Sequence, residues 1–197
     1  IHKDGDLKGS EYRGDLKNNL LSGEGVWEYA SDGVKTGDTL IGVFENGGPI
    51  RGVVISKSGE VYKGDLNNET WSFEGLGVYE WPDGATFEGE FFDGQRQGFG
   101  IYKWADGERY EGNFISGTKQ GYGEYFYKNG DIAKGNYENG QLNGPGEYLH
   151  HEIEGCESHC EIRTVGMFKN GQLSGQGIGF TETGKISYQG EYRKGIW

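Results

Sequence analysis

The sequence is poor in the residues from which helices and membrane spans are built. Its 197 residues include four alanines, one methionine and three prolines, and no apolar run approaches the roughly 20 residues that a membrane-spanning helix needs. The N-terminal residues also lack the pattern of a signal peptide. Glycine supplies 39 residues, and they recur too densely for a helix to continue undisturbed. A helical domain is therefore excluded.

Positive charge is scarce as well. The chain has 19 Lys and Arg against 31 Asp and Glu, a formal net charge of −12 and a sequence pI near 4.8. Nucleic acids and anionic membranes are repelled by such a chain at long range. We therefore expect no nucleic-acid partner. Membrane contact is disfavoured, and a local basic patch around Arg96, Lys103 and Arg109 would have to overcome the net charge.

Cysteine is limited to Cys156 and Cys160, too few for a disulfide framework. Together with His150, His151 and His159 they could supply zinc ligands, but all of these residues lie in one stretch and no second ligand pair comes from elsewhere. Three states stay open for the cysteines, namely reduced thiols in a loop, a Cys156–Cys160 disulfide, or metal ligation, in decreasing order of preference. We expect no cofactor and no metal, with Cys156, Cys160 and His159 as the weaker metal candidates.

Aromatic residues are plentiful (13 Tyr, 10 Phe and 5 Trp), which argues against disorder, and the glycines fall into a repeat. The leading glycines of successive units are 22 to 31 residues apart, which gives seven units and the start of an eighth. These glycines are Gly14, Gly42, Gly64, Gly89, Gly112, Gly135, Gly166 and Gly190. A Gly-x-Gly pair follows in each unit except the second, where Gly52-Val53-Val54 stands at that place and the unit is interpreted as degenerate.

Each unit is typical of a β-hairpin, because two alternating runs are separated by turn dipeptides that accept positive φ. These dipeptides occur within units, as in Asp93-Gly94, and between units, as in Asp106-Gly107. Alternation places aromatic residues and glycines on one face, where a glycine opposite a ring allows the ring to lie flat across the backbone. We expect an all-β fold: an elongated single antiparallel sheet of successive hairpins, twisted and grooved, forming one domain over residues 1–197.

The motif Tyr-x-Gly-x-Phe/Leu, Asn/Asp-Gly, Gly-x-Gly-x-Tyr-x-Trp/Tyr, Asp-Gly resembles the MORN repeat over nearly the whole chain. Its clearest copy is Phe87–Phe91, Asp93-Gly94, Gly98–Trp104 and Asp106-Gly107. The resemblance implies a long, twisted, groove-bearing sheet of hairpins. It also implies a scaffold or organiser of cytoskeletal or membrane-associated assemblies.

One stretch departs from the period, and we interpret residues 149–164 as a hairpin insertion that contacts a partner. The string Gly144-Pro145-Gly146-x-Tyr148, followed by residues 155–159, resembles a segment of the MORN-type radial-spoke head proteins of motile cilia. Here, however, a complete further repeat follows. This resemblance implies a cytoplasmic, cytoskeleton-associated protein, with the cilium axoneme as the more specific setting.

Enzyme activity is not expected. The sequence has no nucleophile–base arrangement, no P-loop and no dinucleotide fingerprint, since its Gly-x-Gly strings precede no helix. Carboxylates recur at equivalent positions on what is expected to be the polar face, whereas a glycosidase needs two unlike carboxylates. These are Glu88, Glu90, Glu108, Glu111 and Glu138.

Three non-catalytic functions remain: a protein-binding scaffold, a phospholipid-binding membrane tether and a carbohydrate-binding module. The scaffold leads, because an aromatic groove offers contact area at low side-chain entropy cost. The candidate partner-binding residues recur at equivalent positions, and they are Tyr79, Trp81, Tyr102, Trp104, Tyr125 and Tyr127. Trp71 and Trp197 are expected to be the aromatic residues least committed to packing.

The partners expected are other proteins of a multi-subunit assembly. An incomplete repeat at Trp197 would leave strand donors and acceptors unpaired, which favours end-to-end self-association or a capping partner.

Overall fold

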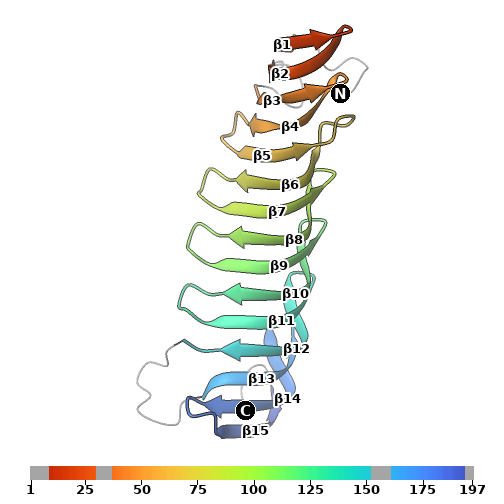
Figure 1. Cartoon of the computed structure of the whole chain (residues 1–197). Helices are drawn as coiled ribbons and strands as arrows, with labels where there is room; N and C mark the ends of the chain where they lie inside the picture. Colours follow the sequence, from red (N-terminus) through yellow and green to blue (C-terminus); the bar gives the residue numbers. More distant parts are fainter. Residues whose placement is uncertain (1–8, 30–36, 152–160, 194–197) are drawn as a thin grey trace. The chain divides into compact units, whose positions relative to one another are not determined.

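The computed structural model describes residues 9–29, 37–151 and 161–193, and within them the chain is all-β (Figure 1). The described residues form no helix, and therefore none long and apolar enough to cross a membrane. Strand order in the sheet follows chain order, and the described pairs are antiparallel. The predicted sheet of successive hairpins is confirmed.

Fifteen strands make up the described fold. They are β1 (Glu11–Lys17), β2 (Leu20–Glu28), β3 (Thr39–Glu45), β4 (Gly48–Ile55), β5 (Val61–Leu66), β6 (Phe73–Glu80), β7 (Thr86–Phe92), β8 (Gln95–Lys103), β9 (Arg109–Ile115), β10 (Thr118–Phe126), β11 (Ile132–Glu138), β12 (Gln141–Leu149), β13 (Glu161–Lys169), β14 (Gln172–Thr181) and β15 (Ile186–Tyr192).

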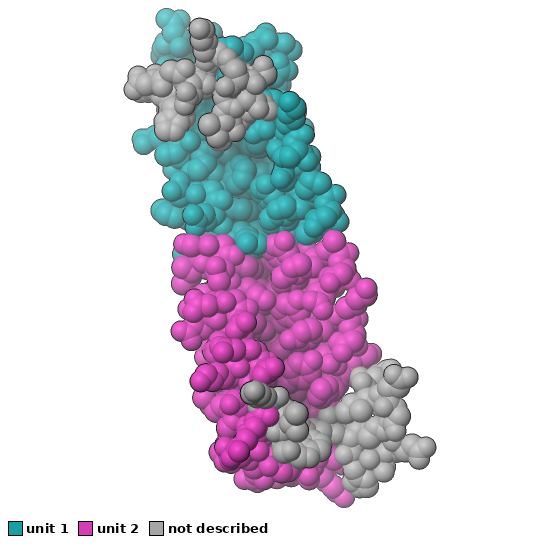
Figure 2. All heavy atoms as spheres, turned by 180° about the vertical axis from the view of Figure 1, so that it is seen from behind, with its two compact units in different colours: residues 1–98 teal, residues 99–197 magenta. Residues whose placement is uncertain are grey.

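The chain divides into two compact units, residues 1–98 and 99–197 (Figure 2). In unit 1, strands β1 to β7 pair in sequence, and in unit 2, strands β9 to β15 do the same. That residues 1–197 form one elongated, grooved domain stays a prediction.

Paired glycines run across the strands of each unit. In unit 1, Gly64 pairs with Gly77, which in turn pairs with Gly89. In unit 2, Gly112 and Gly123 pair in the same way, and Gly123 continues to Gly135. The leading glycine of each motif therefore faces the second glycine of Gly-x-Gly on the neighbouring strand.

In several repeats a tyrosine ring two residues before the leading glycine lies over the glycine pair. A Cβ added at Gly123 would stand 2.3 Å from the Tyr110 hydroxyl oxygen, and its three nearest atoms would all belong to that ring. Tyr62 covers Gly64 and Gly77 in the same manner. Its hydroxyl donates to the carbonyl of Asp65, three residues further on, at 2.7 Å. Rings in contact with bare glycine backbone, as predicted from the alternation, are confirmed.

The first glycine of Gly-x-Gly serves a different purpose from the second. Gly121 has a φ of +72° and lies where the register between β9 and β10 shifts, so it occupies a β-bulge. In the second repeat, Gly52 pairs with both Gly42 and Gly64, which is the place of the second glycine. The interpretation of Gly52-Val53-Val54 took Gly52 as the first glycine of a failed pair, and this is wrong because Gly52 is the second. The glycine that is missing is the one at the bulge, where Ile50 stands in this repeat.

The two sets of turns differ in backbone conformation. Within repeats both central residues have positive φ, for example Asn139 at 51° and Gly140 at 81°, as in a type I′ turn. Between repeats only the glycine does, for example Gly107 at 95°, while the Asp106 carboxylate accepts a hydrogen bond from the Glu108 amide at 3.1 Å. The sequence analysis did not distinguish the two sets, and they differ because in the second set the aspartate closes an Asx turn.

Several within-repeat turns are also bonded to the preceding repeat. The Gly140 amide donates to the Lys119 carbonyl at 3.0 Å, and the Asn139 amide donates to the side chain of Gln120 at 3.1 Å. Residues 170 and 171 make the same pair of contacts with residues 143 and 142. These bonds join hairpin to hairpin within unit 2, as expected for repeats that are stable only when stacked.

The predicted insertion is shorter than 149–164. Leu149 ends β12, and Glu161–Thr164 begin β13, so both margins are strand. The sequence places the departure correctly but cannot show how far the strand pairing, here Leu149 with Arg163, extends into it. Residues 152–160, with Cys156, His159 and Cys160, lie outside the described residues.

The packing of Tyr110 on Gly123 generates a stability prediction. Gly123→Ala should lower the free energy of unfolding by about 1–3 kcal/mol, because the added methyl group overlaps the ring. In a Tyr110→Ala background the same substitution should cost much less, because the three atoms it would meet are gone. Denaturant unfolding of the wild type, the two single variants and the double variant measures the coupling. Equal costs in the two backgrounds would contradict the proposed contact.

Candidate functional site

The aromatic residues fall into two groups by exposure. Of the rings that precede leading glycines, Tyr62, Phe87 and Tyr110 are buried, whereas Tyr12 and Tyr188 are half-buried. The rings that follow Gly-x-Gly are mostly half-buried, although Trp27 is buried. All six candidate partner-binding residues belong to this second group, namely Tyr79, Trp81, Tyr102, Trp104, Tyr125 and Tyr127.

Four of the six candidates lie in unit 2 and form a continuous series of ring contacts. The ring centroids of Tyr102 and Trp104 are 4.5 Å apart, those of Trp104 and Tyr125 5.2 Å, and those of Tyr125 and Tyr127 4.6 Å. The structure therefore brings together in space rings that the sequence placed at equivalent repeat positions.

The series of ring contacts continues beyond the residues predicted from the sequence. Tyr127 contacts Tyr148 at 5.7 Å, and Tyr148 contacts the His150 imidazole at 4.8 Å. The missed signal is that Tyr148 follows Gly144-x-Gly146 just as Tyr125 follows its own glycine pair. We call the six side chains the aromatic row: Tyr102, Trp104, Tyr125, Tyr127, Tyr148 and His150.

Carboxylates of the turns between repeats anchor two of these rings. The Tyr125 hydroxyl donates to Glu108, and the Tyr148 hydroxyl donates to Asp131 at 2.9 Å. In each case the carboxylate follows the turn glycine and bonds the ring 17 residues further along the chain. Burial, together with the bond to Glu108, raises the pKa of Tyr125. Glu108 was expected on the polar face, and this is wrong because its side chain reaches the aromatic row.

Asp131 is the most heavily bonded carboxylate of the site and is only 6% exposed. Its oxygens accept hydrogen bonds from the His151 amide, the Tyr148 hydroxyl and the Asn129 side chain, each at 2.9 Å, and lie 3.6 Å from His150 Nδ1. Burial by itself would raise the pKa of Asp131, but these donors outweigh it and the pKa is lowered. The carboxylate is therefore ionised at neutral pH and fixes one end of the aromatic row.

Lys119 lies against the row with its ammonium group among rings. Its Nζ is 4.6 Å from the Tyr125 centroid and 5.4 Å from that of Trp104, and similarly close to Tyr110 and Tyr137. Burial lowers the pKa of Lys119, although Glu108 acts in the opposite direction. Cation–π contact of this kind holds the flexible lysine against the ring faces.

In unit 1 the remaining two candidates form a smaller cluster. Tyr79 and Trp81 are 4.5 Å apart, Phe73 lies 5.9 Å from Tyr79, and the Arg96 guanidinium is 5.8 Å from the Trp81 centroid. Trp71, expected to be among the least committed rings, is instead 5% exposed and packs edge to face on Trp27 at 5.0 Å. That expectation is wrong for Trp71, because the irregular loop directs the Trp71 indole inward. Trp197 lies outside the described residues.

The basic residues considered for a membrane patch are partly engaged elsewhere. Arg109 pairs with Glu111 at 3.3 Å and lies 4.1 Å from the Phe126 centroid.

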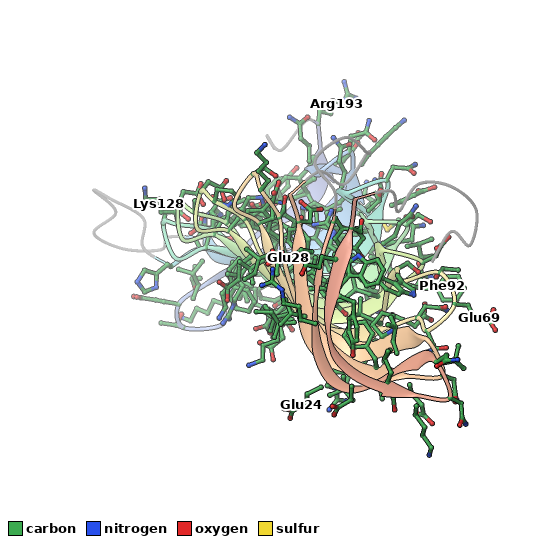
Figure 3. The ribbon with its side chains drawn as sticks, turned by 90° about the horizontal axis from the view of Figure 1, so that it is seen from above. Glu24, Glu28, Glu69, Phe92, Lys128 and Arg193 are labelled. Atoms are coloured by element: carbon green, nitrogen blue, oxygen red, sulfur yellow. The ribbon has the colours of Figure 1, made fainter. Side chains whose placement is uncertain are left out.

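Exposed side chains of the opposite face and the loops, such as Phe92 and Glu69, point outward (Figure 3). Within the described ranges, no group of three or more His, Cys, Asp or Glu side chains is placed to hold a metal ion.

These features define an antiparallel repeat array with one aromatic face. The model of the MORN repeat matches residues 12–34, 73–86, 87–109, 110–132, 134–150 and 165–178. These segments make up more than half of the chain, which belongs to the MORN-repeat family. Membership supports a protein-interaction or membrane-binding module.

Other comparisons add little. No curated protein matches the chain. The TCP domain of Drosophila melanogaster SAS-4 (dCPAP), solved with a proline-rich motif of Ana2 (dSTIL), is 11% identical, with 83% of this chain and 81% of that chain covered and a TM-score of 0.49. A mutant TCP10 domain of Danio rerio CPAP is 9% identical, with 86% and 90% covered and a TM-score of 0.28. At these TM-scores the likeness carries no information on function.

The bonds to Asp131 generate a pH-dependence prediction. Because its folded pKa lies below the unfolded value of about 3.9, its carboxylate stabilises the fold above that pH and ceases to do so as the pH falls through the folded pKa. Asp131→Asn should therefore lower the free energy of unfolding by about 1–3 kcal/mol at neutral pH, and the deficit should shrink in acid.

Glu138→Gln is the matched control, since Glu138 is exposed. It should change the free energy of unfolding by less than about 0.5 kcal/mol at any pH. Denaturant unfolding across the acid range measures both variants. A deficit for Asp131→Asn that persists undiminished in acid would show that its charge is not the cause.

Proposed function

We propose that this chain is a non-catalytic scaffold that binds other proteins along the aromatic row of unit 2. The observation that carries the proposal is the unbroken series of half-buried rings from Tyr102 to His150. Half-buried aromatic residues offer large contact areas and lose little conformational freedom on binding. Their regular spacing suits an extended or helical segment of a partner.

The anchoring of the rings supports the same proposal. Tyr125 and Tyr148 are held by carboxylates and Lys119 by the ring faces, so much of the ordering cost of binding is already met in the fold. The half-buried rings lie beside the carboxylates of Glu108 and Asp131, which would also favour a partner segment that combines apolar residues with basic ones.

The more specific setting is proposed from the sequence resemblance. We place the scaffold in a cytoplasmic, cytoskeleton-associated assembly, and in particular in the radial spoke of the cilium axoneme, on the basis of residues 144–148 and 155–159. Residues between β12 and β13 are proposed to contact a partner, and self-association or a capping partner at one terminus is proposed because repeat arrays generally need their end strands covered.

A membrane tether is the alternative function, since membrane binding also occurs in modules of this kind. The net charge of −12 and the engagement of Arg109 with Glu111 oppose attraction to anionic lipids. A carbohydrate-binding module is the weaker alternative, because the rings of the row lie against one another and not free as stacking platforms.

The test compares the wild type with the Trp104→Phe/Tyr125→Phe double variant, which shortens one ring system and removes one hydroxyl from the row. Recovery of partner proteins from native extract should fall several-fold, while the melting temperature should shift by no more than about 4 °C, roughly 1 kcal/mol for a chain of this size. Quantitative pull-down and thermal unfolding measure the two effects.

Tyr122→Phe is the matched control, because it removes a phenol hydroxyl from β10 on the opposite face, where Tyr122 is 57% exposed. It should leave partner recovery unchanged. Equal recovery with the double variant would overturn the proposal. Salt-resistant flotation of the wild type with anionic liposomes would favour the membrane tether in its place.

A further inference from the structure

Unit 1 contains a cavity of about 220 Å³ on its aromatic face. Pockets for whole small molecules span roughly 300–1,000 Å³, so this one is the size of a single side chain. Its lining includes five aromatic rings and two carboxylates, namely Tyr29, Tyr62, Trp71, Phe73, Tyr79, Asp38 and Glu60.

The rings form the apolar walls of the cavity. Tyr29 and Trp71 meet edge to face at 6.4 Å, and Phe73 and Tyr79 at 5.9 Å. Trp71 is held in place by a left-handed backbone (φ +63°), with its amide donating to the Asn67 carbonyl at 2.8 Å. Ring faces of this kind attract organic cations, and the attraction increases when the site excludes water.

Both carboxylates are fixed by hydrogen-bond donors, and neither pairs with a cation from the described part of the chain. Ser58 donates to Glu60, and the Lys57 amide donates to Asp38 at 3.1 Å. The Ser58 bond lowers the pKa of Glu60, so it is ionised at neutral pH. Among the ion pairs of the described residues, none includes Asp38 or Glu60.

Their negative potential reaches the walls of the cavity. Burial and then Asp38 raise the pKa of Tyr29 to about 12, and burial followed by Glu60 and Asp38 raises that of Tyr79. A charge of opposite sign inside the cavity would be stabilised by the same field. An anion such as phosphate would be repelled, and a neutral group would leave both carboxylates without a counter-ion.

We propose that this cavity binds the side chain of an arginine in a segment of a partner protein. A planar guanidinium stacks on aromatic faces and donates to a carboxylate in the same pose, whereas a lysine ammonium is a compact, strongly hydrated charge. The proposal rests on the proposed function as a protein-binding scaffold, and adds a residue-specific site in unit 1 that is separate from the aromatic row.

The test titrates the full chain with a short capped peptide that carries one central arginine, and follows the indole signal of Trp71 and the ring signals of Tyr79 by nuclear magnetic resonance. Saturable shifts should appear at these residues. The same peptide with citrulline, which is nearly isosteric but uncharged, should bind roughly tenfold more weakly, about 1.4 kcal/mol. The lysine peptide should also bind more weakly than the arginine peptide.

Two chain variants complete the design. Glu60→Gln should weaken the arginine peptide several-fold, and Glu88→Gln, an exposed carboxylate of β7 outside the cavity, should not. Equal binding of arginine and citrulline, equal binding of arginine and lysine, or equal effects of the two variants would each overturn the proposal. The citrulline comparison needs no mutation, so a folding defect in Glu60→Gln leaves it decisive.

The outcome is independent of the partner assay. If the arginine peptide shows no specific binding, but Trp104→Phe/Tyr125→Phe still lowers partner recovery, the arginine site alone is overturned. Specific arginine binding with no effect of that double variant would overturn the aromatic row as the docking surface and leave the arginine site standing.

Discussion

The packing of one ring over a pair of glycines is the contact on which the rest of the structure depends. A Cβ on either glycine would overlap Tyr62 or Tyr110, so the ring and the two glycines must occur together in every repeat that uses this contact. The ring buries its face against backbone and not against other side chains. A single layer of strands, which has no second sheet to cover it, acquires a core in this way.

This contact also explains why some aromatic residues are buried and others are half-buried. Tyr62 and Tyr110, which cover the glycines, are buried, and the rings paired with them on the neighbouring strand, Tyr79 and Tyr125, are half-buried. The turn between repeats then supplies a carboxylate that bonds the phenol of the following repeat, as Glu108 and Asp131 do. In the first unit the loop before β6 adds Trp71 instead, and a cavity results where unit 2 has a continuous row.

Much of the fold follows from sequence periodicity, because it consists of local hairpins. The turns at Asp93-Gly94 and Asn139-Gly140 and the shared face of Gly89 and Phe87 are read correctly from spacing alone. The errors occur where spacing is ambiguous. Gly52 can be aligned as either member of a glycine pair, and only its pairing with Gly42 decides the matter.

The candidate site was recoverable from the sequence in part. Equivalent repeat positions identify Tyr102, Trp104, Tyr125 and Tyr127, and the same rule applied to Gly144-x-Gly146 would have added Tyr148. Asp131 and Lys119 could not be found in this way, because a turn carboxylate and a strand lysine are ordinary surface residues until a neighbouring repeat covers them.

The sequence by itself determined the repeat, the hairpins, the aromatic face and the family, since each depends on residues close together in the chain and recurs in several copies. Tertiary structure alone decided which rings are buried, which carboxylates are bonded and where a cavity remains. Those properties depend on contacts between successive repeats whose side chains differ, and Trp71 demonstrates the point. Its irregular loop suggested an exposed indole, but contacts with Trp27 and Phe44, more than 20 residues away in the chain, place it in the core.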